Sequence, residues 1–173
     1  MITLIYGGSG SGKSAFAEDI VCSTDFKNRY YLATMASADE ESNKRIDRHR
    51  KLREGKDFVT LEYPTDINRA AEDIQKDSIV LLECMSNLVA NEMFGNGKCV
   101  PSLVCADKII ADIKALEEQA SHIVIVTNNI FEDGNTYDEW TKEYMRALGK
   151  INVELARVAK DVYEVVVGIG IKL

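Results

Sequence analysis

The chain has 173 residues, of which 46% are hydrophobic and 28% charged, and its formal net charge is -7. These values are typical of one soluble globular domain with a real core, here residues 1–173. The negative charge argues against general nucleic-acid binding. No apolar run reaches the roughly 20 residues that would span a bilayer.

Apolar runs alternate with helical patterns along the chain. The predicted strands are Ile2–Tyr6, Arg29–Ala33, Asp57–Leu61, Ile79–Leu82, His122–Val126 and Val162–Val167. The predicted helices are Lys13–Val21, Asp39–Arg53, Ile67–Gln75, Met85–Phe94, Leu103–Gln119 and Tyr137–Lys160. This alternation predicts a three-layer α/β fold, with a mostly parallel sheet covered by helices on both faces. Ligands then bind beyond the carboxyl ends of the strands.

The cysteines form no C-x-x-C pair and are interpreted as reduced thiols of a cytoplasmic protein. They are Cys22, Cys84, Cys99 and Cys105. We expect no signal peptide, because no basic segment precedes Ile2 and Gly7 ends the first apolar run. A zinc site is not expected, since neither histidine has a cysteine at ligand spacing.

A complete G-x-x-x-x-G-K-S pattern stands between the first strand and the first helix. It consists of Gly7, Gly8, Ser9, Gly10, Ser11, Gly12, Lys13 and Ser14. Such glycines let backbone N–H groups surround phosphate oxygens, and the following helix points its positive end at the anion. Lys13 is expected to reach the β- and γ-phosphates, and the Ser14 hydroxyl to ligate Mg²⁺. The pattern predicts a nucleoside-triphosphate site without specifying the nucleotide.

Other strand ends carry chemistry of their own. Glu83 ends a buried strand, where a carboxylate often holds Mg²⁺ in phosphate-loop proteins; the alternative is an ordinary polar residue at a strand end. Residues 33–35 either lie near the nucleotide or form a simple strand-to-loop transition. Residues 127–129 are either hydrogen-bond partners of phosphate or turn formers. The glycines of residues 168–171 permit close backbone approach to a base or a neighbouring loop, or mark a turn into a final edge strand.

Six basic residues fall within ten positions of an acidic chain. They are Lys44, Arg45, Arg48, Arg50, Lys51 and Arg53. On a helix, Arg45, His49 and Arg53 share one face, and the guanidinium groups favour a neutral, nucleophilic imidazole. The same arginines suit a triphosphate and the charge that develops at phosphorus. The alternative is a solvated charged face with an incidental histidine.

Glu62 follows the next strand along the chain. A carboxylate can accept hydrogen bonds from guanine N1 and N2, a pair of donors that adenine lacks. The alternative is an ordinary surface glutamate.

Together these residues resemble the bifunctional adenosylcobinamide kinase/adenosylcobinamide-phosphate guanylyltransferases of cobalamin biosynthesis, over nearly the full length. The Arg-Ile-x-x-His-Arg element of residues 45–50 is the most specific part of the resemblance. The further matches are Tyr6-Gly7-Gly8, Ser11-Gly12-Lys13-Ser14, Tyr31-Leu32-Ala33-Thr34, Asp39 and Glu41, Thr60 with Glu62, Leu81-Leu82-Glu83-Cys84 with Asn91, Val126-Thr127-Asn128, Gly149 with Asn152, Leu155-Ala156, and Gly168-Ile169 with Lys172.

The resemblance implies a RecA-like phosphate-loop fold, a trimer, and two reactions on a corrinoid. The first phosphorylates the aminopropanol hydroxyl of adenosylcobinamide with ATP or GTP. The second takes GMP from GTP onto a histidine, here His49, and passes it on to give adenosylcobinamide-GDP. The implied guanine-nucleotide contacts are residues 7–14 with Ala33, Thr34, Met35, Arg50, Lys51, Leu52, Arg53, Glu62 and Glu83, and the implied Mg²⁺ ligands are Ser14 and Glu83.

The chain departs from the family pattern after the fifth predicted strand. Asn129 replaces a glutamate, Phe131 replaces a glycine, and Met145-Arg146 replace an Arg-Asp pair. The loop and histidine segments are intact, so the departures concern the corrinoid surface and the kinase half. Two alternatives stay open: a kinase without guanylylation, and a non-catalytic GTP-binding regulator.

Overall fold

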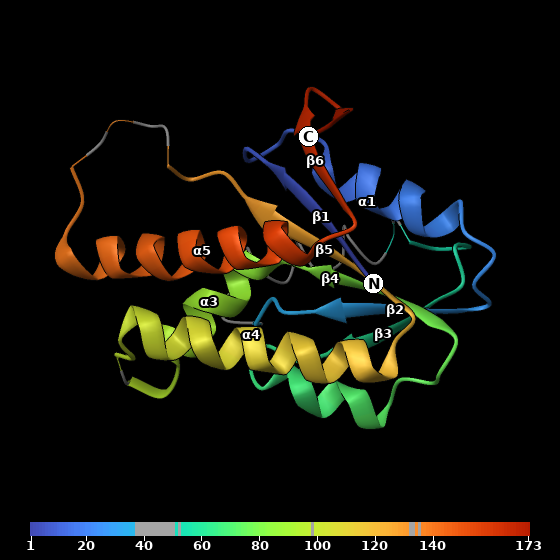
Figure 1. Ribbon diagram of the computed structural model, residues 1–173, viewed down its shortest axis with the longest axis horizontal. Helices are drawn as coiled ribbons and strands as arrows, with labels where there is room; N and C mark the ends of the chain where they lie inside the picture. Colours follow the sequence, from blue (N-terminus) through green and yellow to red (C-terminus); the bar gives the residue numbers. More distant parts are fainter. Residues whose placement is uncertain (37–50, 52, 98, 132–133, 135) are drawn as a thin grey trace.

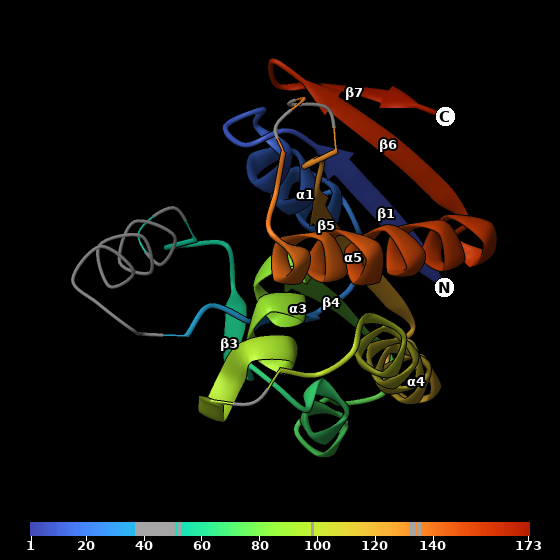
Figure 2. The same cartoon turned by 90° about the vertical axis from the view of Figure 1, so that its left-hand side faces the viewer.

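The computed structural model describes residues 1–36, 51, 53–97, 99–131, 134 and 136–173. Within these ranges, seven strands form one sheet in the order β3-β2-β4-β5-β1-β6-β7. They are β1 (Ile2–Gly7), β2 (Asn28–Ala33), β3 (Phe58–Glu62), β4 (Ser78–Glu83), β5 (His122–Asn128), β6 (Asp161–Val166) and β7 (Ile169–Lys172). Neighbouring strands are parallel except β6 and β7, which are antiparallel. Figure 2 shows β3 and β7 at opposite ends of the sheet.

Helices cover both faces of the sheet. They are α1 (Lys13–Cys22), α3 (Met85–Phe94), α4 (Ser102–Gln119) and α5 (Glu139–Val158), with the short 3₁₀ helices η1 (Ile67–Glu72) and η2 (Gly95–Gly97). Figure 1 shows α1 on one side of the sheet and α3, α4 and α5 on the other. Among the described helices, none is long and apolar enough to cross a membrane.

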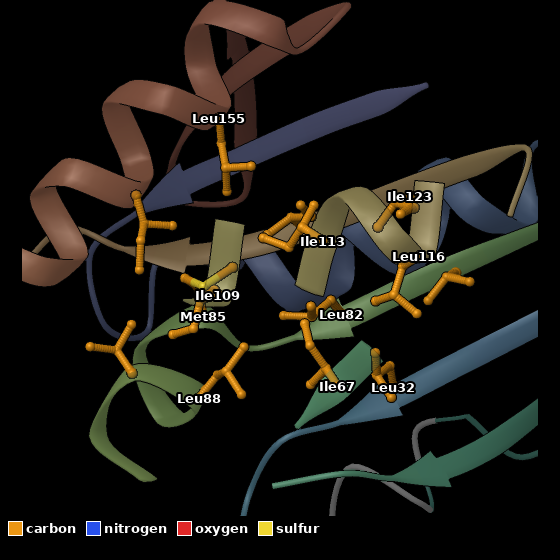
Figure 3. Close-up of a cluster of buried hydrophobic side chains, with 14 of the residues drawn as sticks. Leu32, Ile67, Leu82, Met85, Leu88, Ile109, Ile113, Leu116, Ile123 and Leu155 are labelled. Carbon is orange, nitrogen blue, oxygen red and sulfur yellow. The ribbon is translucent and has the colours of Figure 1, made fainter. Parts of the chain in front are cut away.

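The central strands are buried on both sides, which explains their continuous apolar sequences. In β4, Ile79 and Leu81 pack on the side of α1, whereas Val80 and Leu82 pack on the side of α3, α4 and α5. This alternation follows from the two-residue period of a strand. Figure 3 shows the second of these clusters, where side chains from the three helices gather against the sheet.

The predicted α/β fold, with a mostly parallel sheet between two helical layers, is confirmed. Each predicted parallel strand is present to within two residues at either end, and the predicted helix Met85–Phe94 is reproduced. β5 lies between β1, which leads into the glycine loop, and β4, which ends in Glu83. A strand inserted there is the arrangement of RecA-like phosphate-loop proteins.

The α-helix predicted over Ile67–Gln75 is wrong, because the chain forms a 3₁₀ helix that ends at Glu72. The backbone groups that would extend it bond to side chains elsewhere in the fold. The Ile74 carbonyl accepts from Gln119 Nε2 at 2.8 Å, and the Gln75 N–H donates to the Tyr30 hydroxyl at 3.2 Å. The helix predicted over Asp39–Arg53 lies outside the described residues, apart from Lys51 and Arg53.

His122, the first residue of β5, lies at the edge of the sheet opposite the glycine loop. Its side chain is buried, and Nε2 is 2.9 Å from Thr3 Oγ1. Burial lowers the pKa of His122, and the positive charges of the amino terminus and Lys160 lower it further, against an opposing effect of Asp161. The imidazole is therefore held neutral inside the fold.

This burial predicts a pH-dependent contribution to stability. As the pH falls below the usual histidine pKa of 6.5, the unfolded chain takes up the proton before the folded chain does. Neutral His122 therefore makes its full contribution to the free energy of unfolding above pH 6.5. This contribution is lost as the pH falls through the folded-state pKa. We expect the free energy of unfolding to fall more steeply in the wild-type protein than in His122→Gln, measured with urea from about pH 7.5 to about pH 5. Both proteins contain His49, so its titration cancels when their unfolding free energies are compared. If the difference between the two unfolding free energies stays constant with pH, the prediction is contradicted.

Candidate nucleotide-binding site

The glycine-rich loop joins β1 to α1 at the carboxyl edge of the sheet. It is closed by a hydrogen bond from the Ser11 N–H to the Gly8 carbonyl at 3.2 Å. Gly10 and Gly12 have φ angles of 72° and 91°, which L side chains rarely adopt. The loop thus turns back onto the first turn of α1, where free backbone N–H groups and the helix dipole favour an anion.

The turn between β6 and β7 supports this loop from behind. The Gly168 N–H donates to the Ser11 carbonyl at 2.7 Å. A Cβ atom on Gly12 would lie only 2.9 Å from the Gly168 Cα. The two alternatives for residues 168–171 thus occur together: Gly168 approaches a neighbouring loop, and the chain turns into a final edge strand.

Lys13 points back into the loop that precedes it. Its side chain is buried, and Nζ donates to the Gly8 carbonyl at 3.0 Å. The ammonium group therefore lies within the curve of the loop, where the phosphates of a bound nucleotide would meet it.

Ser14 and Glu83 form the hydrogen bond that joins the loop to β4. The Ser14 hydroxyl donates to Glu83 Oε1 at 2.8 Å, while Glu83 Oε2 is buried without a hydrogen-bond partner among the described residues. Burial raises the pKa of Glu83 to about 7, against the lowering effects of the Ser14 hydrogen bond and the Lys13 ammonium. Serine and carboxylate oxygens suit Mg²⁺, which takes few protein ligands and is completed by phosphates and water. The unpartnered oxygen fits such an ion.

A second buried carboxylate lies on α1. Glu18 is 3% exposed, and its Oε2 is 2.5 Å from Lys56 Nζ. The hydrogen bond that Lys56 donates to Glu18 raises the pKa of Lys56. Sequence reasoning missed Glu18, although it stands four residues after Ser14 on a predicted helix and so shares its face.

Arg53 lies on the ring of Tyr31, with its guanidinium carbon 3.4 Å from the ring centroid. Both side chains are buried. Burial and the nearby Glu83 raise the pKa of Tyr31, so the phenol stays neutral. Arg53 Nη1 has no hydrogen-bond partner among the residues that the structure describes. The sequence carried no signal for this stacking, because Tyr31 and Arg53 are on different elements.

The carboxyl ends of β2, β3 and β4 lie level with one another. Ala33 pairs with Glu62 on one side and with Glu83 on the other. Thr34 is fully buried, and its hydroxyl donates to the Cys84 carbonyl at 2.8 Å and accepts from the Cys84 N–H at 2.7 Å. That hydroxyl fastens β2 to β4, whereas Ala33 and Met35 are partly exposed at the edge.

The end of β5 borders the loop directly. The Asn129 N–H donates to the Gly7 carbonyl at 2.9 Å, which extends the pairing of β1 and β5 by one residue. Thr127 is buried and donates to Asn152 Oδ1 at 2.8 Å, so its side chain is used inside the fold. Asn128 donates to Ser86 Oγ at 2.6 Å.

The structure brings together the loop, Glu83 and Arg53, and sets Ala33 and Glu62 at the same sheet edge. Lys51 is exposed. The predicted nucleophile His49, its neighbours Arg45 and Arg50, and Leu52 all lie outside the described residues. Their roles stay predictions.

The fold and the loop define the class: an α/β protein with a phosphate-binding loop and an adjacent buried carboxylate. Residues 3–173 match the CobU family, described as cobinamide kinase / cobinamide phosphate guanyltransferase, and the chain belongs to that family.

Two relatives are similar over their whole length. The bifunctional adenosylcobalamin biosynthesis protein CobU of Escherichia coli (strain K12) is 29% identical over 184 residues, covering 100% of this chain and 99% of the relative. The protein of the same name from Salmonella typhimurium (strain LT2) is 28% identical over 183 residues, with the same coverage. The flagellar accessory protein FlaH from Methanocaldococcus jannaschii has a TM-score of 0.45 at 12% identity, over 94% of this chain and 70% of FlaH, which is too distant to bear on function.

The close packing of the loop predicts that Gly12→Ala destabilises the protein. The added methyl group meets backbone rather than a flexible side chain, and the residue keeps a positive φ, so we expect a loss of about 1–3 kcal/mol in the free energy of unfolding. Gly8→Ala is the matched control, because a Cβ there meets nothing within 4 Å. Its unfolding free energy in urea should stay within about 0.5 kcal/mol of the wild-type value. Equal stability of the two variants would contradict the proposed packing.

Proposed function

We propose that this protein phosphorylates the aminopropanol hydroxyl of adenosylcobinamide and then transfers GMP from GTP to the new phosphate through a GMP–His49 intermediate. The observation that carries the proposal is the Ser14–Glu83 pair behind an intact phosphate loop, in a chain that matches the cobinamide kinase / cobinamide phosphate guanyltransferase family over residues 3–173. The same activities are in keeping with the bifunctional names of the two bacterial relatives.

The loop is the proposed anchor for the triphosphate in both reactions. Its backbone N–H groups and the first turn of α1 receive phosphate oxygens, and Lys13 places a positive charge among them. Ala33 and Met35 lie beside the nucleotide in this proposal. Thr34 between them is fully buried, and its hydroxyl, N–H and carbonyl are bonded to Cys84, Glu83 and Asn91, so it holds this strand end in place. Glu62 accepts hydrogen bonds from guanine N1 and N2.

Ser14 and Glu83 are the proposed ligands of Mg²⁺. When bound, the ion neutralises part of the triphosphate charge. The buried Oε2 of Glu83 and the Ser14 hydroxyl supply the oxygen atoms that hold it, and the hydrogen bond between the two side chains keeps them at the same place.

The two reactions differ in which phosphorus atom is attacked. In the kinase step, the aminopropanol oxygen bonds to the γ-phosphorus, the bond to the β-phosphate oxygen breaks, and the hydroxyl proton passes to solvent. In the second step, a neutral His49 imidazole nitrogen bonds to the α-phosphorus of GTP and pyrophosphate leaves. An oxygen of cobinamide phosphate then attacks the same phosphorus, and the bond to His49 breaks. Arg45, Arg50 and Arg53 stabilise the charge that develops, with Lys51 and Leu52 alongside.

Labelling tests the histidine intermediate directly. With GTP labelled at the α-phosphate and Mg²⁺, the protein should acquire an acid-labile, base-stable label. The label should vanish in His49→Ala, because a phosphorus–nitrogen bond to that ring can no longer form. The labelled protein is measured after denaturing electrophoresis.

The second histidine provides the control. His122 is buried at the far edge of the sheet, so His122→Gln should keep the label. A label that survives His49→Ala would overturn the assignment. Phosphate transfer to cobinamide without any covalent label would indicate a kinase alone, and GTP binding without turnover would indicate a non-catalytic regulator.

Glu83→Gln tests the metal ligands. The substitution keeps the size of the side chain but removes the charge that an ion requires, so the Mg²⁺ concentration for half-maximal labelling should rise about 10- to 100-fold. The exposed Glu72→Gln is the matched control and should leave it unchanged. Equal Mg²⁺ requirements in both variants would remove Glu83 from the proposed site.

A further inference from the structure

A cavity of about 530 Å³ opens beside the phosphate loop, on the side away from β2 and β3. It lies between the loop, the residues after β5 and the first two turns of α5. Its lining includes Gly8, Asn129, Ile130, Thr141, Tyr144 and Met145. A cavity of this size encloses a drug-sized ligand or one arm of a larger one.

The cavity shares a residue with the phosphate anchor. Gly8 lines it, and the Gly8 carbonyl accepts the hydrogen bond from Lys13 Nζ at 3.0 Å. The bond between the Asn129 N–H and the Gly7 carbonyl holds the opposite wall against the same loop. The residues proposed for guanine, Ala33 and Glu62, belong to β2 and β3, beyond β4 and β5 in the sheet. A ligand in the cavity therefore approaches the phosphates from a different side than the base does.

The chemistry of the described walls favours an uncharged ligand over a second phosphate group. None of the described residues that line the cavity is charged. Ile130 and Met145 are apolar, whereas Thr141 and Tyr144 present hydroxyl oxygens. The Thr141 hydroxyl donates to Asp138 Oδ2 at 2.7 Å and the Tyr144 hydroxyl donates to the Ser86 carbonyl at 3.2 Å. Both oxygens are thus left to accept, which suits a ligand that donates from a hydroxyl or an amide.

We infer that this cavity binds the uncharged, hydroxyl- and amide-bearing arm of the acceptor, so that its hydroxyl faces the outer phosphate at Gly8 and Lys13. The inference rests on the proposed function, which supplies cobinamide as the acceptor. Apolar contacts with Ile130 and Met145 hold the carbon chain of the arm. The oxygens of Thr141 and Tyr144 orient its polar groups.

Trp140 provides a fluorescent reporter beside the cavity. Trp140 is the only tryptophan, is 48% exposed and directly precedes Thr141 in the first turn of α5. Corrinoids absorb near-ultraviolet light, so cobinamide bound in the cavity should quench Trp140 fluorescence. Titration of the full-length protein with cobinamide gives its dissociation constant, and equilibrium dialysis with labelled GTP gives that of the nucleotide.

Met145→Glu places a charge among the uncharged described residues of the cavity. It should weaken cobinamide binding at least tenfold while GTP binding changes less than twofold. Val158→Glu is the matched control: it makes the same change at the other end of α5, where Val158 is 65% exposed and lines no part of the cavity. It should leave both constants within twofold. Asn129→Leu tests the opposite wall of the cavity. It should weaken cobinamide binding without weakening GTP binding, since the backbone hydrogen bond of residue 129 to Gly7 is kept.

Cobinamide binding that is equal in Met145→Glu and Val158→Glu would overturn the inference. So would a parallel loss of GTP binding in Met145→Glu, because the cavity would then belong to the nucleotide site. A third result would contradict the proposed function but not the inference about the cavity. In it, Met145→Glu binds cobinamide more weakly than the wild type, yet the wild type transfers no phosphate to cobinamide.

Discussion

The hydrogen bond between Ser14 and Glu83 is the contact on which the rest of the site depends. It joins two residues 69 positions apart, one on the helix after the loop and one at the end of β4. Because Glu83 is fixed by the sheet, the bond also fixes where α1 begins relative to the strand ends. One carboxylate oxygen is used in this way and the other stays buried without a partner among the described residues. In the proposed site, one side chain therefore both positions the loop and offers an oxygen to the metal ion.

Positive charge is gathered around this carboxylate in a chain whose net charge is -7. Lys13 and Arg53 lie close enough to Glu83 to lower its pKa, and Lys56 forms an ion pair with Glu18, a second buried carboxylate, on α1. Stacking on Tyr31 compensates part of the desolvation of the Arg53 guanidinium. Arg53 Nη1 has no acceptor among the described residues and could donate to an anionic ligand.

Much of the fold was predictable because the central strands are apolar on both faces and the loop motif fixes the order of strand, turn and helix. The motif and the place where β4 ends predicted Ser14 and Glu83 as candidate metal ligands, but the hydrogen bond between them came only from the structure. The 3₁₀ helix at residues 67–72 was not predictable, since Gln119 and Tyr30, distant in sequence, bind the groups that would have extended an α-helix. The stacking of Arg53 on Tyr31 and the cavity beside Gly8 depend likewise on contacts between separate elements. Local sequence patterns do not indicate contacts between elements that are distant in the sequence.

The contact between Gly168 and Ser11 has a consequence for synthesis. The loop is synthesised long before the backbone that supports it, which lies more than 150 positions later in the chain. β6, which pairs with β1 at that edge of the sheet, is equally late. A nascent chain therefore carries the glycine-rich loop through more than 150 residues of synthesis without this support. The loop gains it only after β6 and the turn that follows β6 have been synthesised and have packed against β1.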